Sequence, residues 1–194
     1  MSLLSEKFIE YIRPPDLFMK LAWLGELGSM GIYVLIAYLA VRNPGYAPNP
    51  EASTMLTFIF TALAIIILLF GIIFHALFLS EKAVAKFADG KMPAWMRMII
   101  SQGAAGLDKD KLNTLPEDER NFYVYSRSAF KLSLFLYGFM NSCALFGMVL
   151  AIITRRPALI FPYVGISAIL MLYYFPNLKK LIENAKTIEE YHVD

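Results

Sequence analysis

The sequence lacks most of the features that announce an enzyme or a disulfide-bonded domain. Its single cysteine, Cys143, excludes an intrachain disulfide and any multi-cysteine metal site. It contains no glycine-rich phosphate loop, no HExxH and no GxSxG motif. The formal net charge of +2 gives no basic excess of the kind that nucleic-acid binding requires. We therefore expect no nucleic-acid partner, no bound metal or cofactor and no catalytic activity.

Apolar residues are what the sequence has in excess. They make up 58% of its 194 residues, against about 45–50% in soluble domains, and the mean hydropathy is +0.53. They form long blocks of the length that crosses a bilayer as a helix. We expect an all-α integral membrane protein with four transmembrane helices in two hairpins, within a single membrane domain (1–194). The predicted spans are approximately 17–42, 54–79, 129–153 and 158–175.

The segments around the first span predict a separate interfacial helix. Residues 2–12 place their large apolar side chains on one helical face, as expected for a helix lying in the membrane interface. Pro14 and Pro15 should end it, because a proline disfavours helix in the residue before it. Asp16 should then cap the first span with its carboxylate.

The connection 80–128 and the segment 177–194 should lie outside the bilayer. Tryptophan and methionine in 92–100 predict an interfacial helix, and the polar, glycine-containing segment 103–115 predicts a loop. The helix of the third span should begin near Pro116, well before the bilayer. Residues 177–194 predict a polar C-terminal helix.

Basic residues predict the orientation. On the side of the two termini and the 80–131 segment the sequence carries 15 Lys and Arg, and on the opposite side only Arg42, Arg155 and Arg156. The positive-inside rule then places both termini in the cytoplasm. No signal peptide is expected from the first sixteen residues, and the pattern fits a bacterial cytoplasmic (inner) membrane.

Glu26 is the only acidic residue within the four predicted spans. A carboxylate at membrane depth is costly and marks a site by default. His75, Tyr137 and Asn141 should occupy the same half of the bilayer, so the four residues form a candidate polar cluster. It could relay protons or bind a small ligand, or it could simply hold helices together by hydrogen bonds. As a haem ligand, His75 would lack an intramembrane histidine partner.

Small residues recur in the first and third spans at spacings that let helices approach closely. They could serve packing within one subunit or contact with a partner subunit. The candidate packing residues are Gly25, Gly28, Ser29, Gly31, Gly138, Ser142, Cys143, Gly147 and Ala151.

Two functions from different classes fit these observations best, and a membrane enzyme that uses a supplied cofactor is the third. The first is a non-catalytic membrane subunit, an anchor or scaffold in a larger complex, because four spans with little internal charge are few for an independent transporter. The alternative is a small homo-oligomeric transporter or proton-conducting protein in which Glu26 titrates. The expected partners are the lipid bilayer and either other membrane subunits or further copies of this chain.

Overall fold

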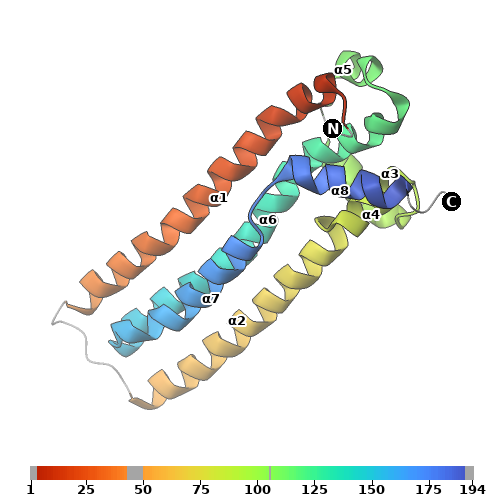
Figure 1. The fold of residues 1–194 in the computed structure, drawn as a ribbon. Coiled ribbons are helices and arrows are strands. Elements are labelled where there is room, and N and C mark those ends of the chain that lie inside the picture. The colour runs from red at the N-terminus through yellow and green to blue at the C-terminus, as the bar shows by residue number, and fades with distance from the viewer. Residues whose placement is uncertain (1–3, 43–49, 105, 191–194) are drawn as a thin grey trace. The chain divides into compact units, whose positions relative to one another are not determined.

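The computed structural model is entirely helical in the residues that it describes, which are 4–42, 50–104 and 106–190 (Figure 1). The first half contains α1 (Glu6–Val41), α2 (Pro50–Phe78), α3 (Glu81–Ala88), α4 (Ala94–Gly103) and α5 (Lys109–Thr114). The second half contains α6 (Glu117–Thr154), the 3₁₀ turn η1 (Pro157–Leu159), α7 (Ile160–Tyr173) and α8 (Leu178–Glu190). The predicted all-α fold is confirmed.

Three stretches are long and apolar enough to cross a membrane: α1, α6 and Ser53–Ala88, which contains most of α2. A fourth is present if Pro157–Tyr173 and Leu178–Ile188, bent by 56° at a short break, count as one span. At about 1.5 Å per residue, the 38 residues of α6 extend well beyond the roughly 30 Å hydrocarbon core of a bilayer. This agrees with a third-span helix that begins outside the membrane.

The chain divides into two compact units. Unit 1 comprises residues 1–22, 74–135 and 176–194, and unit 2 comprises 23–73 and 136–175. Because α1, α2 and α6 contribute residues to both units, this division does not test the prediction of a single membrane domain.

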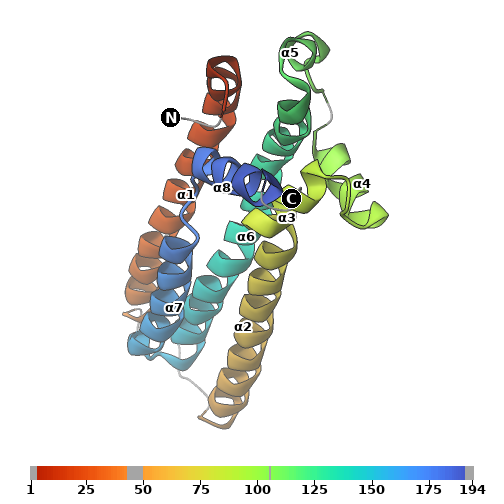
Figure 2. The same ribbon diagram turned by 45° about the vertical axis from the view of Figure 1, so that its right-hand side comes forward.

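Unit 2 exposes apolar side chains in the way that a lipid-embedded helical unit does. Its small core contains Ala37 on α1, Ala151 on α6 and Ile160 at the start of α7. Within this unit, α6 and α7 lie between α1 and α2 in both views (Figures 1 and 2). Isoleucines, leucines and phenylalanines cover the outside of α2, for example Phe58 at 78% exposure. Apolar surface of this extent is stable only against lipid or another membrane protein.

Unit 1 is packed around a dense apolar core. On α8, Leu178, Ile182 and Ala185 are fully buried, and their spacing places them on one helical face. That helix packs against α3. The buried Tyr125 hydroxyl donates to the carbonyl oxygen of Phe78 at 2.9 Å, which joins α6 to the end of α2. Such satisfied, buried polar groups are typical of a well-ordered core.

The prediction that Pro14 and Pro15 end a separate helix is wrong, because α1 continues through both. A proline inside a helix removes one backbone hydrogen bond and costs about 3 kcal/mol. Phe8, Ile12 and Met19 are all buried along this stretch. Burial of each contributes about 1.5–3 kcal/mol, which offsets much of that cost and favours one continuous helix.

Asp16 consequently does not cap the first span. Its Oδ1 accepts a hydrogen bond from the backbone N–H of Leu178 at 2.9 Å, so it satisfies a donor at the start of α8. Its Oδ2 lies 2.6 Å from Lys20 Nζ.

The predicted loop 103–115 contains a short helix, α5. Asp108 begins it by accepting hydrogen bonds from the N–H groups of Asp110 and Lys111, which is an ordinary N-cap. Gly90 adopts φ +71° beyond the end of α3, as a C-terminal glycine commonly does, and α6 begins directly after Pro116 as expected.

Candidate functional site

A polar cluster in unit 2 joins α1 to α6. Glu26, Ser29 and Tyr33 lie at positions i, i+3 and i+7, which places them on one face of α1. The side-chain amide of Asn141 on α6 donates to Glu26 Oε2, to Ser29 Oγ at 2.9 Å and, at a longer 3.4 Å, to the Tyr33 hydroxyl. One amide thus serves three acceptors on the neighbouring helix.

The charge of Glu26 has no cationic counterpart in the cluster. Glu26 is half-buried, and no ion pair joins it to any residue of the described ranges. The Ser29 hydroxyl donates to the backbone carbonyl of Glu26 at 2.7 Å and so has no proton left for the carboxylate. Among the described residues, the Glu26 carboxylate therefore accepts its side-chain hydrogen bond from the Asn141 amide.

Asn141 itself is incompletely satisfied. It is only 7% exposed, and its Oδ1 has no hydrogen-bond partner within the described residues. A buried polar atom without a partner costs about 1–3 kcal/mol, so this oxygen favours a donor or a cation next to the carboxylate. A water or a small cation would each meet that need.

The four residues of the predicted cluster fall in both units. Glu26 and Asn141 are in contact, and Tyr137 is buried one helical turn before Asn141 on α6. His75 belongs to unit 1, whereas the other three belong to unit 2. The contact between Glu26 and His75 accordingly stays a prediction.

The structure adds one residue that the sequence analysis missed and changes the role of another. The predicted polar cluster does not include Tyr33, although the position of Tyr33 seven residues after Glu26 places it on the same helical face. Ser29 is predicted only as a helix-packing residue, yet its hydroxyl takes part in the hydrogen bonds of the cluster.

The small residues of α6 pack tightly against α7. A Cβ added to Gly147 would lie 2.6 Å from Tyr163 Cβ, so the two helices approach closely at this point. Cys143 Sγ lies 3.8 Å from the Tyr163 carbonyl oxygen, and Ala151 packs in the core cluster with Ile160. Ser142 instead donates to the Gly138 carbonyl of its own helix at 2.7 Å.

The other small residues have no such neighbour among the described residues. A Cβ added to Gly25, Gly28, Gly31 or Gly138 would meet none of their atoms within 4 Å. The three glycines of α1 are also exposed.

In chemical terms the cluster offers one carboxylate, one amide and two hydroxyls. Carboxylate, amide and hydroxyl oxygens are ligands for a proton or a hard cation. Among residues 4–42, 50–104 and 106–190, no three or more His, Cys, Asp or Glu side chains gather in a group that could hold a metal ion. Comparison of the chain with protein-family models, curated proteins and solved structures found no match.

Proposed function

We propose that this protein is a non-catalytic integral membrane subunit that holds a place in a larger membrane assembly. The observation that carries the proposal is the bare outer face of α1. Gly28 and Gly31 are exposed, and no described residue lies within 4 Å of a Cβ added to either of them. By contrast, Tyr163 of the same chain occupies the space beside Gly147. Exposed backbone of this kind suits the close approach of a helix from another subunit.

The polar cluster supports this proposal by fixing which face of α1 points outward. At about 100° per residue, Gly28 and Gly31 lie roughly 200° and 140° around the helix from Glu26. Tyr33 lies within about 20° of Glu26 by the same count. The contact of Glu26 with Asn141 therefore holds the polar face inward and leaves the glycine face open.

Leucines border this open face. Leu24 and Leu35 fall on the same side of α1 as the two glycines, at 59% and 56% exposure. Lipid is as apolar as leucine, so apolarity alone does not drive helices together in a bilayer. Exposed glycines bordered by leucines favour the close helix packing that does.

Native mass measurement in mild detergent tests the proposal. We expect the wild-type chain of 22.0 kDa to appear in a heavier assembly, either with other subunits or with further copies. Gly28→Leu combined with Gly31→Leu should release the lone chain, because both side chains would cover the exposed glycine backbone and prevent close approach of another helix. Gly165→Leu on α7, which also has open space around it, is the matched control. A lone wild-type chain with no co-purifying subunit would overturn the proposal.

The second candidate is a homo-oligomer that conducts protons or a small monovalent cation. The carboxylate of Glu26, which has no ion pair among the described residues, and the unsatisfied Asn141 Oδ1 favour it specifically, since such residues mark ion and proton paths in membranes. Flux into proteoliposomes tests it. Glu26→Gln should abolish flux and Glu6→Gln, on the exposed start of α1, should not. Wild-type flux in Glu26→Gln, or no flux in the wild type, excludes this candidate.

For either function we propose that both termini face the cytoplasm of a bacterial inner membrane, on the basis of the Lys and Arg distribution. In a Cys143→Ser background, Lys180→Cys should resist a membrane-impermeant maleimide in intact cells, and Arg156→Cys should react. The reverse labelling pattern would contradict this orientation.

A further inference from the structure

A small cavity in unit 1 carries two cationic side chains. Its volume is about 220 Å³, and α1, α4 and α6 all contribute to its lining. From α1 come Phe18 and two adjacent prolines, from α4 comes Gly103, and from α6 come Arg127, Phe130 and Lys131. At about 30 Å³ for each water molecule, the cavity has room for roughly seven, which is enough for a phosphate group.

The two cations of the cavity have no ion-pair partner among the described residues. Lys20 pairs with Asp16 at 2.6 Å and Lys186 with Asp118 at 2.6 Å, so these two basic residues of unit 1 have acidic partners. Arg127 and Lys131 form no ion pair and no hydrogen bond with the described residues. The cavity has no acidic residue in its lining. It therefore presents two positive charges, one turn apart on α6, to an anion.

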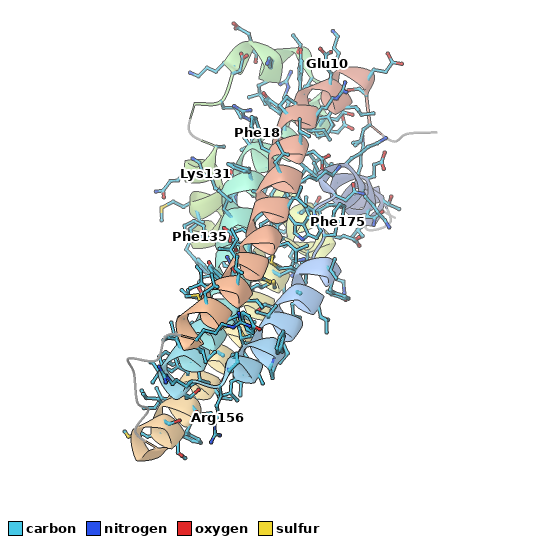
Figure 3. All side chains as sticks on the ribbon, turned by 90° about the vertical axis from the view of Figure 1, so that its left-hand side faces the viewer. Glu10, Phe18, Lys131, Phe135, Arg156 and Phe175 are labelled. Carbon is cyan, nitrogen blue, oxygen red and sulfur yellow. The ribbon has the colours of Figure 1, made fainter. Side chains whose placement is uncertain are left out.

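An exposed apolar strip of unit 1, formed by Phe18 on α1 and Phe135 on α6, begins at the cavity. Arg127, Lys131 and Phe135 lie at i, i+4 and i+8 on α6, hence on one face. Figure 3 shows Lys131 and Phe135 on the same side of α1. Phe135 is 63% exposed and Phe18 is 58% exposed, and the Phe18 ring packs against Phe130 with centroids 6.2 Å apart.

We propose that this cavity binds the phosphate group of an anionic phospholipid, with the acyl chains lying along the exposed apolar strip. Arg127 and Lys131 bind the phosphate by charge and hydrogen bonding. Phe18 and Phe135 contact the acyl chains. A basic pocket between helices at the membrane surface is a recognised arrangement for anionic headgroups, and continuity with apolar surface favours a lipid over free phosphate.

Native mass spectrometry of the full chain in neutral detergent, titrated with phosphatidylglycerol, tests the site. A basic residue near a charged membrane surface contributes enough to change affinity roughly fivefold. We expect Arg127→Gln to weaken phosphatidylglycerol binding about fivefold and the double variant with Lys131→Gln about 25-fold. Lys109→Gln with Lys111→Gln on α5 removes the same charge elsewhere and should leave binding unchanged. These residues are exposed, so unaltered thermal unfolding should show that all variants fold.

Further binding measurements distinguish an anionic lipid from other anions as the ligand of the cavity. Phosphatidylcholine should bind much more weakly than phosphatidylglycerol, and millimolar inorganic phosphate should not displace the lipid. Phe18→Ser should weaken the binding of phosphatidylglycerol but not the binding of soluble glycerol phosphate. Equal binding of the two lipids, or wild-type affinity in the double variant, overturns the proposal. Displacement by inorganic phosphate at similar affinity also overturns it, because the ligand would then be the free anion.

Discussion

Replacement of Asn141 tests the contact that joins α1 to α6 within unit 2. The side-chain amide of Asn141 donates to Glu26 and Ser29 and is 7% exposed. Asn141→Leu removes these donors and leaves the half-buried carboxylate without its polar neighbour. We expect the variant to be less stable than the wild type, and we expect the loss to depend on Glu26.

The expected magnitude comes from comparing two scales. Hydrogen bonds to charged groups contribute about 1.5–3 kcal/mol in soluble proteins. Polar contacts between membrane helices average about 0.6 kcal/mol and reach about 1.7 kcal/mol, because the unfolded chain in the membrane also finds partners. Glu26 lies on a helix that is long and apolar enough to cross a membrane, so we apply the second scale. We expect a coupling free energy between Glu26 and Asn141 of about 0.6–1.7 kcal/mol.

A double-mutant cycle measures this coupling. Glu26→Leu, Asn141→Leu and the double variant are unfolded reversibly in mixed micelles, and the free energies of unfolding are compared. Glu26→Gln is the matched control: it keeps an acceptor oxygen for the Asn141 amide and should cost much less than Glu26→Leu. Additivity within about 0.3–0.5 kcal/mol would refute the contact.

Three further predictions concern other contacts. Gly147→Leu should cost about 1–3 kcal/mol by overpacking, because the new Cβ would lie 2.6 Å from Tyr163 Cβ; thermal unfolding measures it. Glu119→Ala should cost about 1–3 kcal/mol, because this 2% exposed carboxylate accepts hydrogen bonds from the N–H and hydroxyl of Ser5 at 2.7 and 2.5 Å; chemical denaturation measures it. If Glu26 meets His75, Glu26→Gln and His75→Ala should deviate from additivity by more than about 0.5 kcal/mol in thermal unfolding.

The first two of these have a control in the same helix, and the third has a refuting outcome. Gly138→Leu should be nearly silent, because nothing lies within 4 Å of its added Cβ; an equal loss at both glycines would contradict the packing argument. Glu117→Ala removes an exposed acid from the same first turn as Glu119 and should cost little. Additive effects of Glu26→Gln and His75→Ala would mean that those two side chains do not touch.

The long helices could be predicted because their signals are local. Continuous apolar blocks predicted the spans, and Pro116 with the acidic residues after it predicted the start of α6. The passage of α1 through Pro14 and Pro15 could not be predicted in the same way. It depends on burial of Phe8 and Ile12 against the rest of unit 1, which local preferences do not contain. Asp108 is a local N-cap signal for the helix that follows it, but the polar, glycine-containing composition of 103–115 predicted a loop there.

The candidate site could be predicted only in part. Depth along the spans placed Glu26 and Asn141 in the same half of the bilayer, and the two are in contact. Which further residues join them depends on the rotation of each helix about its axis. That rotation is set by packing, such as the close approach at Gly147. For this reason residue type alone did not predict that Ser29 and Tyr33 belong to the cluster.

The proposed contact between the glycine face of α1 and another membrane subunit can be tested directly by a photo-activatable amino acid placed at Gly28 in native membranes. We expect a crosslinked product heavier than the 22.0 kDa chain by the mass of a protein, and little such product from the same probe at Ile66, an exposed position on α2. A probe at Gly28 that reacts only with lipid would contradict the proposed contact.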